Sequence, residues 1–296
     1  MKEGELFSLL LRLHPVAPGQ VAPGAGNQVQ AAFLDMVRQG DTALAERLHL
    51  PNQRRPYTLS LLKGFNHLSP EQLSEAIQKN HLLDVLPGQV YWLRFTMLDT
   101  SVFSSFMQHL ILKPRELILR LGEAQFEVSR LLATPEPVAG APSWVAYSSF
   151  AAQHAGLRHE AQSRYHFEFT SPTAFSMGQR QWSKLLTLFP EPADVFESLA
   201  RQWEAFAPEH LRLAGQGLTP QALAAWCAEQ IIVTRYRLET CYLPQARFGQ
   251  TGFIGEIDYE VKGSRAAAEA RWLTPLAQFA LFGGVGYKTA MGMGQA

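Results

Sequence analysis

The chain has little cysteine, no net charge and no long apolar run. Only two of its 296 residues are cysteine, Cys227 and Cys241, too few and too far apart for a disulfide framework or a zinc site of paired cysteines. A reducing cytoplasm is therefore the expected location. The first apolar run ends after six residues at Arg12, so neither a signal peptide nor a membrane span is predicted there.

The balance of charges excludes one class of nucleic-acid binder. Basic and acidic residues number 26 each, which argues against a histone-like protein that coats nucleic acid without specificity. Arginine nevertheless makes up 19 of the 26 basic residues, and its planar guanidinium suits bidentate contacts with phosphate and bases. Any binding to nucleic acid should therefore use a local basic groove.

Hydrophobic periodicity predicts an α+β protein of two tandem ferredoxin-like (RRM-like) domains. The first half reads as strand, helix, strand, strand, helix, strand. Its predicted strands are residues 5–13, 56–62 and 90–98 with a hairpin about Gly122, and its predicted helices are residues 29–39, 42–49 and 101–111. A stretch rich in proline, from Ala133 to Ser143, places the domain boundary, giving domains 1–138 and 139–296.

The second half repeats this order. Its predicted strands are residues 144–152 and 163–170 with a hairpin of 231–243 and 252–261, and its predicted helices are residues 181–189, 195–206, 220–230 and 264–282. A glycine-rich loop and a short last strand complete the chain.

The glycine-rich end, FGGVGYKTAMGMGQ from Phe282 to Gln295, is the most unusual feature of the sequence. It is not a P-loop, because Tyr287 stands where the glycine before the lysine is needed and no helix follows. Glycines permit positive φ and let another backbone or a phosphate come close. The loop is therefore either a phosphate-binding surface or a tight structural turn.

The pattern Gly-h-Gly-x5-Gly-h-Gly, where h is apolar, resembles the signature loop of the RAMP superfamily of CRISPR-associated proteins. Three more segments resemble its CRISPR RNA-processing endoribonuclease family, called "Cas six". They are LAERLHLPNQRRPYTLSLL (44–62), FEFTSPTAF (167–175) and GFIGEIDYEV (252–261). Together these landmarks cover residues 44 to 296 in the family's order.

The segment around His49 carries the predicted chemistry. His49 ends a predicted helix, Arg54 and Arg55 follow, and no acidic residue occurs between Arg47 and Pro70. An imidazole can move a proton near neutral pH, and guanidinium groups can stabilise a phosphorane. The resemblance implies metal-independent attack by a 2′-OH, leaving a 2′,3′-cyclic phosphate and a 5′-hydroxyl, with His49, Arg55 and Arg54 as catalytic residues. A capping role for His49 at its helix end is the structural alternative.

One feature departs from the family. Some members carry a catalytic tyrosine on the first helix, but residues 29–39 contain none. Either His49 works with cations alone or another residue substitutes.

The expected RNA-binding residues lie in two regions. Arg235 and Arg237 would share one face of a strand, which is either a phosphate-binding surface, extended by Arg247, or an ordinary solvated face. The others lie in the glycine-rich end: Gly284, Gly286, Lys288, Thr289, Gly292 and Gly294.

The resemblance thus implies an endoribonuclease that cuts CRISPR repeat RNA to give guide RNAs. No cofactor or metal is expected, and His154, His159 and His166 lack the spacing of a strong metal motif. The alternatives are a catalytically silent RAMP that binds guide RNA in an effector complex, and a two-domain protein unrelated to RNA. No membrane contact is expected. The sequence predicts neither the repeat that is bound nor whether that repeat forms a hairpin. It also does not predict product retention, dimer formation or the effector subtype.

Overall fold

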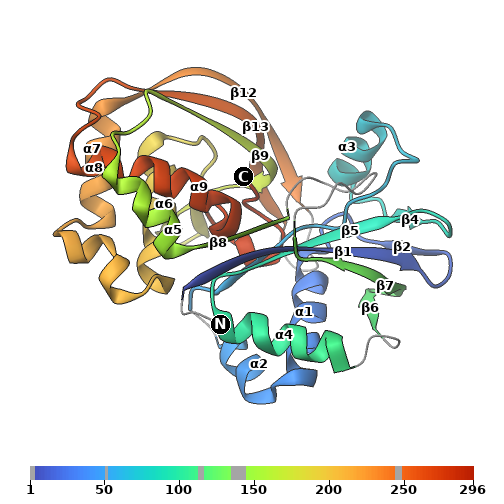
Figure 1. Cartoon of the computed structure of the whole chain (residues 1–296). Helices are drawn as coiled ribbons and strands as arrows, with labels where there is room; N and C mark the ends of the chain where they lie inside the picture. Colours follow the sequence, from blue (N-terminus) through green and yellow to red (C-terminus); the bar gives the residue numbers. More distant parts are fainter. Residues whose placement is uncertain (1–3, 51–52, 113–116, 135–144, 244–248) are drawn as a thin grey trace.

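The N-terminal domain is built around β1 (Glu5–Pro15), the central strand of its sheet (Figure 1). The computed structural model describes residues 4–50, 53–112, 117–134, 145–243 and 249–296. β1 pairs antiparallel with β5 (Tyr91–Met97) on one side and with β7 (Ala124–Leu132) on the other. β3 (Tyr57–Leu59) and β6 (Ile118–Leu121) complete the order β3-β5-β1-β7-β6. The predicted ferredoxin-like order is thereby confirmed.

Two helices cover one face of this sheet. They are α1 (Gly26–Gly40) and α4 (Thr100–Leu112), and α2 (Thr42–His49) packs beside α1. Phe33 of α1 lies against the rings of Tyr57 and Phe95. Asp41 caps α2, because its carboxylate accepts a hydrogen bond from the backbone N–H of Leu44 at 2.9 Å. The remaining elements are α3 (Pro70–Lys79) and a small sheet of β2 (Gly19–Val21) and β4 (Leu83–Val85).

The C-terminal domain has the ferredoxin-like order of elements in a less regular form. β9 (Arg164–Thr173), β12 (Ile231–Leu243) and β13 (Gln250–Val261) form a sheet with the order β12-β13-β9. Its core includes α6 (Pro192–Phe206) and α9 (Leu273–Gly283), which pack against each other. The other helices and strands described here are β10 (Phe175–Gln179), β11 (Lys184–Thr187), α5 (Phe150–His154), α7 (Pro220–Gln230) and α8 (Ala268–Arg271). The described residues also form the 3₁₀ turns η1 (Ala155–Arg158), η2 (Glu209–Leu211), η3 (Leu213–Gln216) and η4 (Thr289–Met291).

The expected last strand is wrong. After α9 the described chain forms only η4, because Gly292 and Gly294 adopt φ of +86° and +70°, which extended strands do not permit. Residues 292–295 still lie where a fourth strand would, since the N–H of Gly294 donates to the carbonyl of Pro172 and that of Thr170 to the carbonyl of Gln295. The position is thus filled by an irregular segment.

Three other sequence-based assignments also need correction. Residues 181–189, expected as a helix, contain β11, which pairs with β10 as a hairpin. The strand expected at 144–152 is β8 (Ala146–Ser149), and α5 begins at Phe150. The helix expected over 264–282 begins only at Ala268 and is divided into α8 and α9.

The proposed domain boundary falls in residues 135–144, outside the described residues. The strand after it, β8, pairs with β1 and so belongs to the N-terminal sheet. The boundary after residue 138 stays a prediction.

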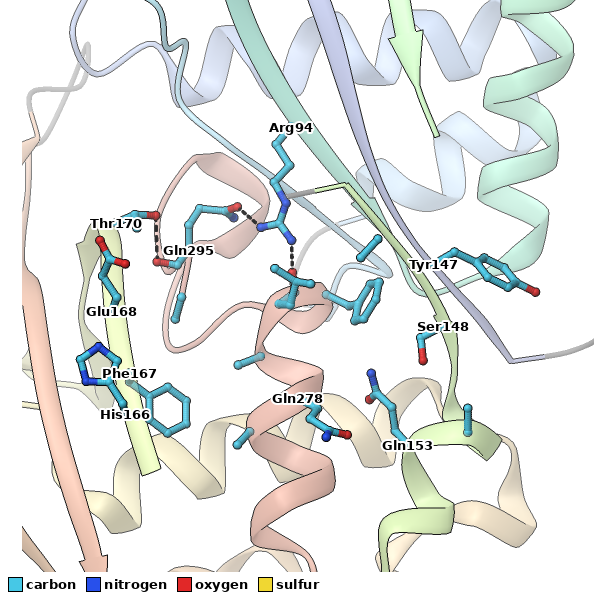
Figure 2. Close-up of a pocket in the computed structure, with 17 residues that line it drawn as sticks. Arg94, Tyr147, Ser148, Gln153, His166, Phe167, Glu168, Thr170, Gln278 and Gln295 are labelled. Atoms are coloured by element: carbon cyan, nitrogen blue, oxygen red, sulfur yellow. Dashed lines mark hydrogen bonds between the residues drawn. The ribbon is translucent and has the colours of Figure 1, made fainter. Parts of the chain in front are cut away.

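A buried arginine links the two domains. Arg94 of β5 is 3% exposed, and burial lowers its pKa to about 9. Its guanidinium donates to Ser8 Oγ at 2.8 Å, to Gln295 Oε1 at 2.8 Å and to the carbonyl oxygen of Leu281. Figure 2 shows it reaching from the sheet to Gln295 and to the end of α9. The C-terminal domain, through α9, therefore packs against β1, β3 and β5 of the N-terminal sheet.

Candidate active site

The backbone of the glycine loop (residues 284–294) repeatedly adopts positive φ angles. Gly284, Gly286, Gly292 and Gly294 all have φ between +65° and +86°, and Lys288 joins them at +57°. A Cβ on Gly286 would lie 2.5 Å from the carbonyl oxygen of Ala174, and one on Gly294 would lie 2.1 Å from that of Val285. Only glycine meets both requirements at these two positions.

Several amides of the glycine loop are engaged inside the protein. The N–H of Gly284 donates to the carbonyl oxygen of Ala280 at 2.9 Å, and that of Gly294 to the carbonyl of Pro172 at 3.0 Å. The N–H of Gly286 donates to Ser198 Oγ of α6 at 2.8 Å. These three glycines therefore shape the loop with their own amides already bonded.

The glycine loop forms one wall of a cleft of about 790 Å³. Gly286, Lys288 and Thr289 line it from the C-terminal domain. Arg54 and Arg55 line it from the N-terminal domain, on the segment between α2 and β3, here called the basic loop (residues 53–55). The structure thus brings together the expected basic residues and the expected phosphate-binding loop, although they are more than two hundred residues apart in sequence.

His49 ends α2 and is not one of the residues that line this cleft, but Arg55, which lines it, contacts the backbone of His49. Its side chain is exposed, and its carbonyl oxygen accepts a hydrogen bond from Arg55 Nη2 at 3.4 Å. Among the described residues, no hydrogen bond fixes the His49 ring. Its neighbours Pro51 and Asn52 lie outside the described residues.

Arg54 and Arg55 are held from the opposite domain. Arg54 Nη1 donates to Gln202 Oε1 at 3.4 Å, and Gln202 Nε2 donates to the carbonyl oxygen of Arg55 at 3.0 Å. The pKa of Arg54 is lowered, mainly by burial and secondly by the charge of Arg201, while the charge of Glu197 opposes the shift. No feature of the sequence around Gln202 marked it as part of the site.

Lysines flank Tyr287 of the glycine loop. Lys184 of β11 donates to the Tyr287 hydroxyl at 3.2 Å and lies 4.3 Å from the ring centroid, and Lys288 lies 5.5 Å from it. Burial, and after it the charge of Lys184, lowers the pKa of Lys288. Lys184 was missed because its segment was expected to be helical.

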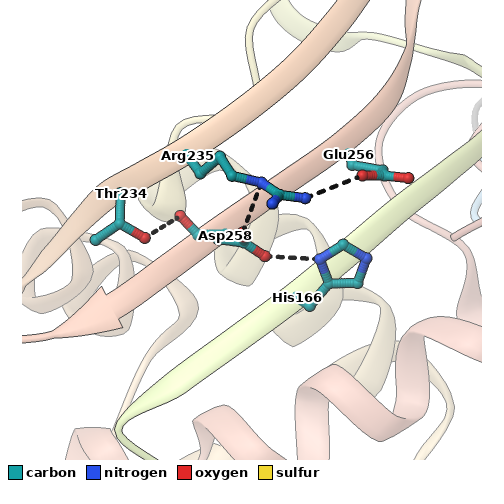
Figure 3. A network of polar contacts seen from close by, with 5 residues as sticks. All are labelled: His166, Thr234, Arg235, Glu256 and Asp258. Atoms are coloured by element: carbon teal, nitrogen blue, oxygen red, sulfur yellow. Dashed lines mark hydrogen bonds and ion pairs between the residues drawn. The ribbon is translucent and has the colours of Figure 1, made fainter.

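Arg235 and Arg237 lie elsewhere, on the sheet of the C-terminal domain. Arg235 faces carboxylates, with Nη2 3.5 Å from Glu256 and Nε 3.3 Å from Asp258 (Figure 3). Arg237 pairs with Glu256 in the register of β12 and β13. Asp258 also bonds His166 at 2.7 Å, and this hydrogen bond is the main cause that lowers the pKa of Asp258. Arg247 lies outside the described residues.

Helix α1, which contains no tyrosine, presents a glutamine to the cleft. Gln30 of α1 lines the cleft, and its Nε2 donates to the hydroxyl of Tyr57 at 3.2 Å. Tyr57 is fully buried, which raises its pKa. A phenol from β3 thus lies behind Gln30, shielded from the solvent.

The described residues contain neither a metal-binding cluster nor a membrane-spanning helix. No group of three or more histidine, cysteine, aspartate and glutamate side chains there could hold a metal ion. No helix in the described part is long and apolar enough to cross a membrane.

Two tandem ferredoxin-like domains closed by a glycine-rich C-terminal loop define a protein of the RAMP type. A family model described as "CRISPR-associated endoribonuclease Cas6" matches residues 167–296, and one described as "CRISPR Cas6 N-terminal domain" matches residues 6–155. The chain belongs to the Cas6 family.

A curated relative and several solved structures are similar to this chain. The CRISPR-associated endoribonuclease Cas6 of Streptococcus thermophilus is 26% identical over 136 residues, which span 46% of this chain and 50% of that protein. A Cas6 product complex has a TM-score of 0.76 at 24% identity, with 98% of both chains covered. Thermus thermophilus Cas6 has a TM-score of 0.67 at 22% identity, with 99% of this chain and 98% of that one covered. An RAMP protein binding different RNA substrates has a TM-score of 0.56 at 15% identity, with 98% of both covered.

Proposed function

We propose that this chain is a sequence-specific endoribonuclease that cuts CRISPR repeat RNA in precursor transcripts to release guide RNAs. The observation that carries the proposal is the cleft in which Arg54 and Arg55 of one domain lie with Lys288 of the glycine loop from the other. Such a cleft offers positive charge to a phosphate from both sides. The family assignment and the solved Cas6 product complex support an RNA substrate.

The proposed reaction is a metal-independent transesterification. The 2′-oxygen attacks the adjacent phosphorus, the bond from phosphorus to the 5′-oxygen breaks, and a 2′,3′-cyclic phosphate and a 5′-hydroxyl result. The 2′-OH gives up a proton and the 5′-oxygen gains one. His49 serves as general acid or base for one of these transfers. Arg55 and Arg54 stabilise the charge of the phosphorane.

Binding of the RNA is assigned mainly to the glycine loop. Because the amides of Gly284, Gly286 and Gly294 are already bonded, the glycines act by shaping a surface that a backbone can approach. Lys288 and Thr289 then supply the phosphate contacts, and Gly292 keeps the turn that presents them. Arg235 and Arg237 add secondary contacts on a face where carboxylates offset their charge.

The test is a cleavage assay on labelled repeat RNA in excess EDTA. It compares the wild type with His49→Ala and includes a substrate with one 2′-deoxy sugar at the cut. Cleavage at a single site by the wild type, blocked by the deoxy sugar and strongly reduced in His49→Ala, is expected. Activity that disappears in EDTA would overturn the metal-independent mechanism.

A second candidate is a catalytically silent RAMP that binds guide RNA as a subunit of an effector complex. The position of His49 favours it, since the ring is exposed and no hydrogen bond among the described residues orients it. Tight binding of repeat RNA without any cleavage would establish this candidate. Loss of both binding and cleavage would overturn both.

A further inference from the structure

One helix supports both loops that line the cleft. Ser198 and Gln202 lie four residues apart on α6, so their side chains share one face of the helix. Ser198 Oγ accepts the hydrogen bond from Gly286 of the glycine loop, and Gln202 contacts the basic loop. The adjacent face of α6 is anchored in the core, with Leu199 and Trp203 fully buried. The helix is therefore a rigid common support.

The amide of Gln202 is used at both ends. It is 6% exposed, its Nε2 donates to the carbonyl oxygen of Arg55 at 3.0 Å, and its Oε1 accepts from Arg54 Nη1 at 3.4 Å. Hydrogen bonds shielded from water are electrostatically stronger than exposed ones. One side chain thus fixes the backbone of one proposed catalytic arginine and the guanidinium of its neighbour.

The basic loop needs such a restraint. Arg201, also on α6, lines the same cleft, and after burial its charge is the second cause that lowers the pKa of Arg54, while Glu197 opposes the shift. Arg55 Nη2 donates a hydrogen bond to the carbonyl oxygen of His49, so the placement of Arg55 also affects the end of α2. The restraint comes from the C-terminal domain, although the basic loop and His49 belong to the N-terminal one.

We propose that Gln202 is a positioning residue for RNA cleavage, which holds the basic loop in the geometry that the reaction needs and ties it to the helix that carries the glycine loop. The inference rests on the proposed function. Gln202 need not touch the RNA, because it acts through Arg54 and Arg55. Its loss should lower the rate of the chemical step and leave the affinity for RNA nearly unchanged.

The test uses the full-length protein and two variants of Gln202. Gln202→Leu removes both hydrogen bonds at similar volume. Gln202→Glu keeps an acceptor for Arg54 but has no N–H for the carbonyl of Arg55, and it decides the question if the leucine variant fails to fold. The matched control is Ser198→Ala on the same face of α6, which removes the contact to the glycine loop only.

Three quantities are measured: the single-turnover rate at saturating repeat RNA, the Kd for that RNA, and hydrogen exchange of the backbone amides of residues 53–59 without RNA. Gln202→Leu should cleave about 10- to 100-fold more slowly, as expected for a small displacement of catalytic groups. Its Kd should stay within about twofold of the wild type, and the exchange should accelerate. Ser198→Ala should instead raise Kd and leave the exchange of the basic loop unchanged.

The outcomes separate this inference from the proposed function. A wild-type rate in Gln202→Leu, or a rate that falls only together with affinity, would overturn the positioning role. Unchanged exchange of residues 53–59 would overturn the restraint itself. If the wild type binds repeat RNA but never cuts it, the proposed function fails, and the exchange measurement still decides whether Gln202 holds the basic loop.

Discussion

Arg94 of the N-terminal sheet donates a hydrogen bond of 2.8 Å to the side-chain oxygen of Gln295, the penultimate residue of the sequence. The amide nitrogen of Gln295 donates in turn to Thr58 Oγ1 at 3.3 Å, and its backbone N–H donates to Ser171 Oγ at 2.9 Å. Gln295 therefore contacts both domains at once. Because it directly follows the glycine loop, the interface also fixes one end of that loop.

Replacement of Gln295 by leucine should destabilise the whole chain. The change leaves the buried guanidinium of Arg94 without one of its acceptors, and a buried unsatisfied polar group costs about 1–3 kcal/mol, or more if charged. The free energy of unfolding in urea should fall by about 2–3 kcal/mol. Gln278→Leu is the control, since Gln278 lines the same interdomain pocket but is exposed. An equal effect of the two variants would contradict the role given to Gln295.

Lys63 near this interface should make stability depend on pH. Burial, and after it the charge of Arg94, lowers the pKa of Lys63 to about 8 from its ordinary 10.5. Below pH 8 the lysine is charged in both the folded and unfolded states, and its burial penalty is fully present. Between pH 8 and 10.5 the folded state loses the proton first, so the unfolded state binds more protons and stability rises with pH.

The measurement is the free energy of unfolding between pH 7.5 and 9.5 for the wild type and for Lys63→Met. The wild type should gain stability relative to the variant as pH rises through this range, because the methionine variant lacks the titrating group. Taking the difference between the two proteins cancels titrations that they share. A difference that is flat or falls with pH would contradict the prediction.

Local patterns in the sequence were enough for most of the fold. The β12–β13 hairpin was predicted from two runs of strand-forming residues, 231–243 and 252–261, and the structure has strands over 231–243 and 250–261. The helix prediction for residues 181–189 was wrong because short apolar runs suit a helix or a strand equally well. There Trp182 is 73% exposed, and the half-buried residues of β11 pair with β10. Pairing between strands, which periodicity does not contain, decided the outcome.

The residues of the site could be predicted only in part, because contacts between distant segments are likewise absent from local sequence patterns. Arg54, Arg55 and Lys288 stood out by residue type and by resemblance, and the fold brings them to one cleft. Gln202 did not, since its partner Arg55 is 147 residues away and neither residue's neighbours predict the contact. Arg235 stood out as a candidate phosphate contact on a strand face, but cross-strand carboxylates pair with it.

Lys288 should contribute to RNA binding through its charge, and Arg235 much less. Lys288→Gln removes a cation from the cleft, so it should weaken binding of all RNA sequences alike and reduce the slope of log Kobs against log salt by about 1. Arg235→Gln should change that slope by much less, because Glu256 and Asp258 already offset its charge. Filter binding of repeat RNA between low and physiological salt measures both slopes. A larger change of slope in Arg235→Gln than in Lys288→Gln would contradict the prediction and would indicate that the RNA lies over the sheet of β12, β13 and β9.

Substitution of Tyr57 tests whether its phenol takes the place of the tyrosine missing from α1. The hydroxyl of Tyr57 is fully buried behind Gln30, and its raised pKa keeps it protonated at neutral pH. If His49 works with cations alone, Tyr57→Phe should cleave repeat RNA within about threefold of the wild-type rate, whereas His49→Ala should lose about 10²–10⁴-fold, the usual contribution of general acid or base catalysis. Single-turnover rates at saturating RNA make the comparison. A loss of similar size in both variants would assign the third catalytic group to Tyr57, and it would require Gln30 to move aside when RNA binds.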